Sequence, residues 1–301
     1  MRALVTGGAG FIGSHLVQRL LANGDDVVVI DDLSSGRREH LDDLDVDFLC
    51  ASIEDRGALR EALQGVHAVF HLAAMVSVPL SLQRPATCLR TNVVGTAGVL
   101  GEAGEAGAGV VVFASSAAVY GEQDERGPGG WSATHPTSPY GVSKVAGEQL
   151  TALSDGAAMR TVSLRFFNVY GSRQETRGPY ASLVPALAAR ARRGEPLTLF
   201  GDGAQTRDFL HVSDAVDAAV FCARAPQARG TYDVGTGVEV SIEQLARQVA
   251  ALMGSTAGVD HQPARAGDVR RSVASVARLR DAGWSTSVDL RSGLEQTLTS
   301  Y

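Results

Sequence analysis

Unbroken apolar runs recur along the first half of the chain. They occupy Arg2–Thr6, Val27–Ile30, Val66–His71, Val110–Ser115 and Thr161–Phe167. Runs of this length, rich in valine and bounded by glycine or polar residues, predict strands that are buried on both faces of a sheet.

Amphipathic segments separate these runs. An apolar period of about 3.6 residues predicts helices over Phe11–Ala22, Asp55–Leu63 and Pro85–Glu105, and a further helix begins near Tyr140. Asn23 and the glycine after it supply a stop signal for the first helix. Strands that alternate with helices in this way predict an α/β fold, a Rossmann-type doubly wound parallel sheet with helices on both faces.

A glycine-rich turn links the first strand to the first helix. Gly7, Gly10 and Gly13 have the Gly-x-x-Gly-x-x-Gly spacing, and the next strand ends at Asp31. The spacing alone is weak evidence, but its place between a strand and a helix fits the dinucleotide fingerprint. Gly7 permits the tight turn, Gly10 admits the diphosphate, and Gly13 allows the helix to pack closely on the sheet.

Asp31 indicates which dinucleotide binds. It follows Gly7 by 24 residues, where a carboxylate accepts hydrogen bonds from the adenosine ribose and repels a 2'-phosphate. The position therefore favours NAD over NADP. Arg37 and Arg38 leave the alternative open, because a nearby arginine can accommodate that phosphate, but we interpret them as solvated surface charges.

The second half of the chain is less regular. It predicts a helix over Ser182–Arg193, a strand over Leu197–Gly201, and a helix to Met253 that opens with a Ser241-x-x-Gln244 capping box. We expect a dinucleotide-binding domain at residues 1–167 and a smaller, mixed substrate domain at residues 168–301, with room for segments of the second to return to the first. The stretch 126–139 predicts a loop, either over the site or as a passive connection.

Composition argues against several classes of function. The net charge is -6, the pI is near 5.6, and no cluster of five basic residues occurs, which predicts no nucleic-acid or anionic-membrane partner. No apolar stretch approaches the roughly 18 residues that span a bilayer. Three distant cysteines and a start without signal-peptide architecture predict a cytoplasmic protein. The seven histidines lack paired ligand spacing, which predicts no metal.

Lys144 is the only lysine among 301 residues. It follows Tyr140 by four residues, and the preceding Ser138 and Pro139 are typical of an N-cap and a first helical position. Tyr140 and Lys144 would then share one helix face, where the ammonium favours the ionised phenol. A depression of about 3 pKa units would make the phenol a usable base, and a neighbouring cation acts in that direction. An isolated pair at this spacing is more commonly a surface lysine beside a core tyrosine.

Four ordered motifs resemble the extended short-chain dehydrogenase/reductase family. They are TGGAGFIG at residues 6–13, HLAA at residues 71–74, SSAAVYG at residues 115–121, and the Tyr140 and Lys144 pair. Within this family the chain is similar to nucleotide-sugar 4-epimerases of the UDP-glucose 4-epimerase type. The likeness runs from Met1 to about Trp284 and includes the segments 164–171, 201–209 and 265–268.

The resemblance implies a bound NAD and three catalytic residues. Tyr140 would take the proton from the sugar 4-hydroxyl, Lys144 would hold the nicotinamide ribose and keep Tyr140 acidic, and Ser116 would hydrogen-bond the reacting oxygen. The 4-keto sugar would then turn and be reduced on its other face. The implied cofactor-binding residues are Gly7, Gly10, Phe11, Ile12, Gly13, Asp31, Asp32, Ser52, Ile53, Leu72, Ala73, Ala74, Asn92, Tyr140 and Lys144.

Two of these positions carry alternatives. Ser52 stands where relatives usually have an aspartate for the adenine amine, so the adenine contact would be weaker or would use backbone groups. Asn92 matches a position that lines the nicotinamide, but a locally bonded helix polar group fits equally well.

In the substrate domain, Arg207 and Arg265 match a diphosphate clamp, with Asp268 near the nucleoside ribose. The implied substrate-binding residues are Ser116, Asn168, Arg207, Arg265, Asp268 and Ser272.

Two alanines argue against dehydration and decarboxylation. Related 4,6-dehydratases carry Asp and Glu at the positions of Ala117 and Ala118, and related UDP-glucuronate decarboxylases carry Glu at the second. Ser272 stands where a bulky tyrosine restricts some relatives to unmodified glucose and galactose. We therefore expect NAD-dependent inversion of C4 in UDP-glucose and UDP-galactose or in the N-acetylhexosamine pair.

Three other functions remain open at this stage. They are a UDP-glucuronate 4-epimerase, a 4-keto-sugar reductase, and a non-catalytic NAD-sensing protein. The family also implies a homodimer that pairs through the helices beginning at Pro85 and at Tyr140.

Overall fold

The computed structural model describes residues 1–123, 133–175, 182–264 and 268–301. Its centre is a sheet of seven parallel strands in the order β11-β6-β5-β4-β1-β2-β3. The strands are β1 (Arg2–Thr6), β2 (Asp26–Asp31), β3 (Asp47–Cys50), β4 (Ala68–His71), β5 (Val110–Ser116), β6 (Arg160–Phe166) and β11 (Gly230–Val234). The strand order changes direction between β1 and β4, and ligands of such sheets bind outside the carboxyl ends of the strands at this point. The predicted fold class is confirmed.

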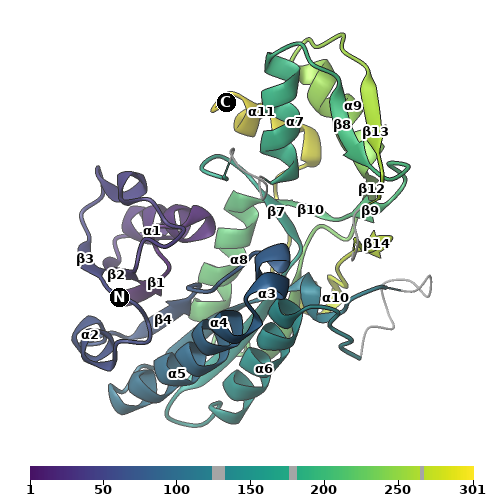
Figure 1. Ribbon diagram of the computed structural model, residues 1–301. Coiled ribbons are helices and arrows are strands. Elements are labelled where there is room, and N and C mark those ends of the chain that lie inside the picture. Colours follow the sequence, from purple (N-terminus) through teal and green to yellow (C-terminus); the bar gives the residue numbers. More distant parts are fainter. Residues whose placement is uncertain (124–132, 176–181, 265–267) are drawn as a thin grey trace.

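Helices cover both faces of this sheet (Figure 1). α1 (Phe11–Ala22) and α8 (Val212–Arg224) pack together on one face, and α2 (Arg56–Ala62), α5 (Gly95–Glu105) and α6 (Pro139–Leu153) cover the other. Each face has its own apolar core. Leu16 and Val216 belong to the first core, while Leu59 and Val99 belong to the second.

The predicted helix over Pro85–Glu105 is interrupted. It consists of α4 (Pro85–Leu89), the π-helical turn η2 (Arg90–Val94) and α5. The Gly95 amide donates to the carbonyl of Arg90, five residues back, so the turn contains one extra residue. A pattern with a 3.6-residue period does not reveal such an insertion. A short helix that the sequence did not predict, α3 (Val78–Gln83), precedes it.

Other predicted ends shift by one or two residues. Asp55, expected inside a helix, is the N-cap of α2 and accepts from two backbone amides. The strand expected to begin at Val66 begins at Ala68, because the Val66 amide closes a turn onto Leu63. The capping box is confirmed, since the side chains of Ser241 and Gln244 each accept from the other's backbone amide.

The second half forms a smaller layer of short strands and helices around a separate core that includes Leu187, Leu199, Leu245 and Leu294. β7 pairs with β10, β8 with β13, and β9 lies between β12 and β14. The strands are β7 (Asn168–Tyr170), β8 (Leu197–Phe200), β9 (Thr206–Arg207), β10 (Phe209–His211), β12 (Val240–Ser241), β13 (Val259–Gln262) and β14 (Arg271–Ser272). The helices are α7 (Leu183–Arg192), α9 (Ile242–Leu252), α10 (Ala277–Asp281) and α11 (Leu290–Leu298), and the 3-10 turns η1 (Arg38–Leu41) and η3 (Ala117–Val119) lie in the first half.

One long segment returns to the main sheet after residue 168. α8 packs against α1, and β11 forms the edge of the sheet beside β6. The sequence left room for such a return but did not locate it, because α8 buries small side chains, alanine and valine above all, and no leucine, isoleucine or phenylalanine. The boundary at residue 167 stays a prediction.

Candidate active site and cofactor-binding edge

The glycine turn lies at the carboxyl end of β1. Gly7 has a φ of 72°, and a Cβ there would lie 2.8 Å from the backbone nitrogen of Ala73. A Cβ on Gly13 would lie 2.1 Å from the Gly7 carbonyl oxygen, so only glycine allows α1 to begin here. Gly10 is the N-cap of α1 and has no side chain to cover the first-turn amides. These amides can bind an anion, and the residues therefore fit a dinucleotide diphosphate.

Asp31 is fixed beside this turn. Its carboxylate accepts from the amide of Ala9 at 3.0 Å and from that of Leu33 at 2.8 Å. Burial raises the pKa of Asp31 above its usual value, and the two amide bonds oppose that rise. Asp32, by contrast, accepts from the amide of Ser34 in a local turn. The structure thus places Asp31, rather than Asp32, against the glycine turn.

Both arginines that could hold a 2'-phosphate have protein partners. Arg37 pairs with Glu175 at 3.1 Å, which joins the segment after β2 to the loop after β7. Arg38 stacks over the ring of Phe48 at 4.6 Å. These contacts agree with their alternative interpretation as surface charges.

The segment after β4 passes directly behind the glycine turn. The Leu72 amide donates to the Thr6 carbonyl and the Ala73 amide donates to the Thr6 hydroxyl, and Leu72, Ala73 and Ala74 are all half-buried. Ile53 is buried and packs against Gly95. Ser52 accepts from the amide of Glu54 in a local turn.

Sequence reasoning assigned no role to the side chain of His71. It is fully buried at the end of β4, with Nδ1 2.8 Å from the Thr6 hydroxyl and Nε2 2.9 Å from the Thr96 hydroxyl. Burial lowers the pKa of His71 to about 3. A neutral imidazole therefore links the glycine turn to α5. A histidine that ends an apolar run was the only sequence signal for this brace.

Asn92 lies in the π-helical turn. Its amide donates to the Met75 carbonyl at 3.0 Å and to the Ser143 hydroxyl at 2.9 Å, and its oxygen accepts from the Met75 amide at 2.8 Å. Asn92 therefore connects the segment after β4 to α6 and is more than a locally bonded helix residue. Whether it also lines the nicotinamide stays a prediction.

Tyr140 and Lys144 occupy the first turns of α6. Ser138 caps the helix by accepting from the Gly141 amide at 3.1 Å, and Pro139 is the first helical residue. Tyr140 is 8% exposed and Lys144 is 3% exposed. The ammonium lies 5.7 Å from the centre of the Tyr140 ring and donates to the carbonyl of Ala114 on β5 at 2.7 Å. The two side chains are therefore adjacent, as predicted.

Ser116 completes the group from the end of β5. Its hydroxyl accepts from the Ala118 amide at 3.1 Å and lies beside the Tyr140 phenol, whose pKa it lowers. The structure thus brings the three predicted catalytic residues together at the carboxyl-terminal edge of the sheet. Their roles stay predictions.

The charge balance differs from the sequence-based expectation. Burial raises the pKa of Tyr140 to about 12, although the Ser116 hydroxyl opposes the rise. Burial also lowers the pKa of Lys144 to about 8. In the chain alone, desolvation of the phenol is the larger effect, and the predicted role of Lys144 in keeping Tyr140 acidic stays a prediction.

The predicted substrate residues cluster around β9. Arg207 is buried, forms an ion pair with Asp268, and donates to the Thr206 carbonyl at 2.7 Å. Ser272 lies opposite Arg207 in the pairing of β14 with β9 and is also buried. Asn168 is exposed on β7, and its backbone N–H donates to the Asp208 carbonyl at 3.0 Å. Arg265 and residues 126–132 of the predicted loop lie outside the described residues.

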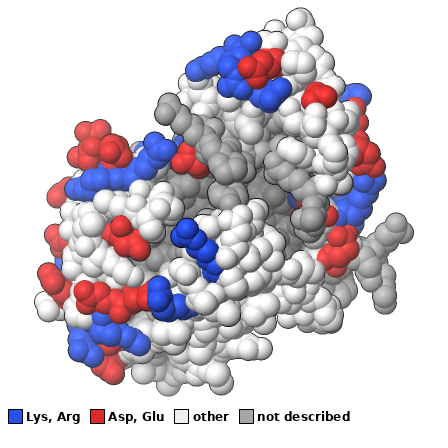
Figure 2. Space-filling model, viewed as in Figure 1, with Lys and Arg blue, Asp and Glu red and all other residues white. Residues whose placement is uncertain are grey.

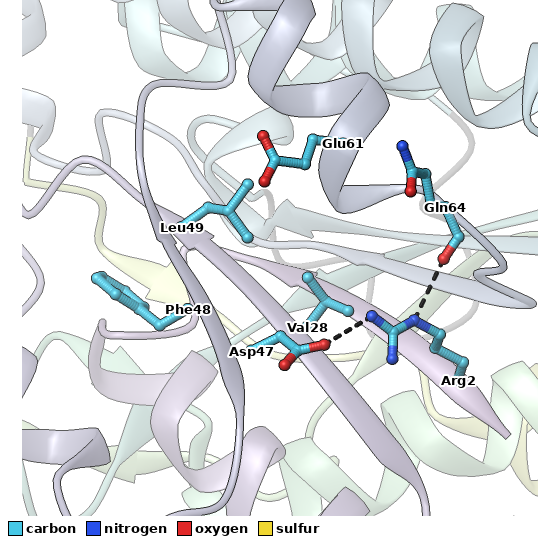
Figure 3. Close-up of a pocket in the computed structure, with 7 residues that line it drawn as sticks. All are labelled: Arg2, Val28, Asp47, Phe48, Leu49, Glu61 and Gln64. Atoms are coloured by element: carbon cyan, nitrogen blue, oxygen red, sulfur yellow. Dashed lines mark hydrogen bonds and ion pairs between the residues drawn. The ribbon is translucent and has the colours of Figure 1, made fainter.

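A depression of 390 Å³ lies elsewhere, near the amino ends of β1 and β3 (Figure 3). Arg2 crosses it, pairing with Asp47 at 2.7 Å and donating to the Gln64 carbonyl at 3.2 Å. None of its lining residues is a predicted site residue. Because the glycine turn and Tyr140 lie at the opposite edge of the sheet, we do not assign the reaction to this depression. Its lining residues are Arg2, Val28, Asp47, Phe48, Leu49, Glu61 and Gln64.

Two negative observations apply to the described ranges. His, Cys, Asp and Glu side chains do not gather there in a group of three or more that could bind a metal ion. None of the helices in those ranges combines the length and the apolar character that a membrane span requires.

A dinucleotide-type glycine turn with a serine, a tyrosine and a lysine at the same sheet edge defines a dinucleotide-binding α/β enzyme. The family model for the NAD dependent epimerase/dehydratase family matches residues 3–235, and the chain belongs to that family. The predicted family is confirmed.

Three relatives illustrate the likeness. UDP-glucose 4-epimerase of Mycolicibacterium smegmatis is 39% identical, with 100% of this chain and 98% of that protein covered. The crystal structure of UDP-glucose 4-epimerase from Thermotoga maritima with UDP-glucose superimposes with a TM-score of 0.94 at 35% identity, covering 100% and 98% of the two chains. The Thermus thermophilus UDP-glucose 4-epimerase complex with NAD gives a TM-score of 0.92 at 35% identity, covering 100% and 98%.

Proposed function

We propose that this protein is an NAD-dependent epimerase that inverts C4 of a UDP-linked hexose. The observation that carries the proposal is the buried Tyr140 phenol beside the Ser116 hydroxyl and the Lys144 ammonium, at the same sheet edge as the glycine turn. Full-length likeness to UDP-glucose 4-epimerases supports it. Ala117 and Ala118 in η3 provide no acid for dehydration or decarboxylation.

The predicted cofactor residues would hold NAD across the switch point of the sheet. The first-turn amides of α1 would bind the diphosphate, and the Asp31 carboxylate would accept from the adenosine ribose. NAD, when bound, supplies the reversible oxidant for C4. The chain itself supplies the proton transfer, the orientation of the sugar and the exclusion of water.

Tyr140 acts as the proton acceptor and donor in this mechanism. With a pKa of about 12, almost all of the phenol is neutral at pH 7, so proton removal requires positive charge beside it. The Lys144 ammonium provides such charge below its own pKa of about 8. Ser116 holds the reacting oxygen in line with the phenol, and the same phenol returns the proton after the sugar has turned.

The cluster around β9 would hold the nucleotide while the sugar turns. The fork of Arg207 suits a diphosphate, with Arg265 as the second arm, Asn168 assisting and Asp268 near the ribose. Asp268 now pairs with Arg207, so substrate binding would replace or share that ion pair. Ser272 is a small residue beside Arg207, and it leaves room for a 2-acetamido sugar.

A panel of nucleotide sugars tests the function. Purified protein is incubated without added cofactor with UDP-glucose, UDP-N-acetylglucosamine, UDP-glucuronate and dTDP-glucose, and C4 inversion is followed by NMR. We expect inversion of UDP-glucose and of UDP-N-acetylglucosamine, with NAD retained by the protein. Inversion of UDP-glucuronate alone, or a requirement for stoichiometric NADH, would replace the proposal with one of its rivals. Turnover of UDP-glucose with no turnover of UDP-N-acetylglucosamine would overturn only the prediction that a 2-acetamido sugar is accepted.

We also propose a homodimer. Large apolar side chains are exposed on adjoining helices, including Val78 and Leu82 on α3, Leu89 on α4, Val94 on η2 and Val142 on α6. Figure 2 shows that this face carries few charged side chains. A contiguous exposed apolar surface of this kind is typical of a protein interface.

The predicted cytoplasmic location is consistent with three free cysteines.

A further inference from the structure

A buried row of polar side chains joins the catalytic helix to the segment that follows β14. It begins at Glu148 on α6, one turn after Lys144, and continues through Arg165 on β6 and Tyr120 after η3 to Asp233 on β11. Glu148, Tyr120 and Asp233 are buried, and the Arg165 side chain is 15% exposed. None of the four is a predicted site residue.

The hydrogen bonds along this row are continuous. Arg165 forks onto the Glu148 carboxylate through Nε at 2.8 Å and Nη2 at 2.6 Å. Its Nη1 donates to the Tyr120 hydroxyl at 2.7 Å, and that hydroxyl donates to Asp233 Oδ1 at 2.7 Å. Asp233 Oδ2 accepts from the Ser275 amide at 3.0 Å. The Tyr120 hydroxyl is therefore the junction between the charged pair and Asp233, which binds the segment after β14.

The far end of the row lies in the segment that follows Ser272. Three successive amides there each donate to a side chain from a different part of the chain. Val273 donates to Gln123 at 2.8 Å, Ala274 to Asp208 at 3.2 Å, and Ser275 to Asp233 at 3.0 Å. Residues 273–276 belong to no helix or strand, so side chains rather than a backbone ladder determine where this segment lies.

Both ends of the row lie beside groups that the reaction needs. At one end, the Glu148 carboxylate helps to raise the pKa of Lys144 against the larger effect of burial, and it accepts from the hydroxyl of Ser115, the neighbour of Ser116. At the other end, the segment leads back to Ser272 beside Arg207. Buried ion pairs add little net stability compared with apolar packing, so stability alone is a weak reason for this arrangement.

We infer that Tyr120 is a positioning residue for the substrate: through Asp233 it sets the distance between the segment 272–275 and the catalytic group of Ser116, Tyr140 and Lys144. The inference rests on the proposed function, because that distance matters only if a sugar must reach from Arg207 to Tyr140. Asp233 acts through Tyr120 and Ser275 in the same way.

Tyr120→Phe removes the junction and leaves the ring, which packs against Phe167. We expect the KM for the UDP-sugar to rise about ten-fold, as for the loss of one charge-assisted hydrogen bond, with a smaller change in kcat. NAD content should be unchanged. Amide hydrogen exchange in peptides covering 270–276 should accelerate. Tyr232→Phe is the matched control, because it removes a phenol from the same strand as Asp233 without touching the row, and it should leave KM and exchange unchanged.

Two outcomes are distinguishable. If the wild type inverts no sugar, the proposed function fails, while faster exchange at 270–276 and weaker binding of UDP in Tyr120→Phe would still support the positioning role. If the wild type is active and Tyr120→Phe keeps its KM and its exchange pattern, the inference is overturned, whatever happens to the melting temperature. Should Tyr120→Phe fold poorly, Asp233→Asn replaces it, with the same direction of change expected.

Discussion

At the scale of single residues, Tyr140 and Lys144 are buried although the reaction needs a charge on each of them. Each is buried, and burial disfavours the charged form that the reaction needs from it. Tyr140→Phe retains the ring but removes the transferable proton. We expect turnover to fall at least about 10³-fold, within the usual range for a lost general base, while NAD remains bound. Assays of C4 inversion and of cofactor released on denaturation check this. Activity surviving within ten-fold would remove the assigned base.

The burial of His71 predicts that the free energy of unfolding depends on pH. Its pKa falls from 6.5 in the unfolded chain to about 3 in the fold, so below pH 6.5 the unfolded chain binds a proton that the fold excludes. The free energy of unfolding must therefore decrease as the pH falls through this window, and the full contribution is present above it. Between pH 7 and 5.5 we expect the wild type to lose about 1 kcal/mol relative to His71→Gln, as measured by urea unfolding. Parallel pH curves for the two proteins would show that His71 is protonated in the fold.

At the scale of elements, the start of α1 tolerates no side chain at Gly13. Alanine there would place its Cβ 2.1 Å from the Gly7 carbonyl. Gly13→Ala should lower the free energy of unfolding by about 1–3 kcal/mol through overpacking and should abolish NAD retention. Gly101→Ala is the matched control, since that site on α5 is open and alanine should add about 0.5–1 kcal/mol to helix stability. Thermal unfolding and cofactor content are the measurements. Equal NAD content in the two variants would contradict the role assigned to the turn.

The elements also show what the sequence could and could not reveal. The strands β1, β2, β4, β5 and β6 and the caps of α6 and α9 were predictable, because apolar runs and capping residues act locally. The π-helical turn was not, since one extra residue leaves the apolar period almost unchanged. β11 was missed because its five residues form a strand only by pairing with β6, which is far from it in the sequence.

The site shows the same division. Gly7, Asp31, Tyr140 and Lys144 were predictable because the spacing of each in the sequence already fixes a shared turn or helix face. The Tyr120 junction was not predictable, because its partners come from β6 and β11, 45 and 113 residues away. The raised pKa of Tyr140 in the chain alone was not predictable, since the depth of its burial depends on the whole fold.

At the scale of the whole molecule, assembly is the testable property. Leu82 is 58% exposed on α3 and Val142 is 46% exposed on α6. Glutamate at both positions would place charges in the proposed interface, where desolvation is costly. We expect the wild type to be a dimer by size exclusion with light scattering, and the Leu82→Glu/Val142→Glu variant to be a monomer. Val238→Glu, at an equally exposed valine after β11, should remain a dimer. A monomeric wild type at micromolar concentration would rule the interface out.

The single lysine determines how the protein reacts with reagents that acylate amines. All 26 other basic side chains are arginines, and the one ε-amine lies 3% exposed behind Tyr140. Apart from the terminal α-amine, which pairs with Asp25, activated esters therefore find no amine on the folded exterior, and acylation of Lys144 has to wait for the first turns of α6 to open. The rate of this one modification, followed by mass spectrometry of the peptide that contains Lys144, would time the opening of the catalytic helix without any engineered label.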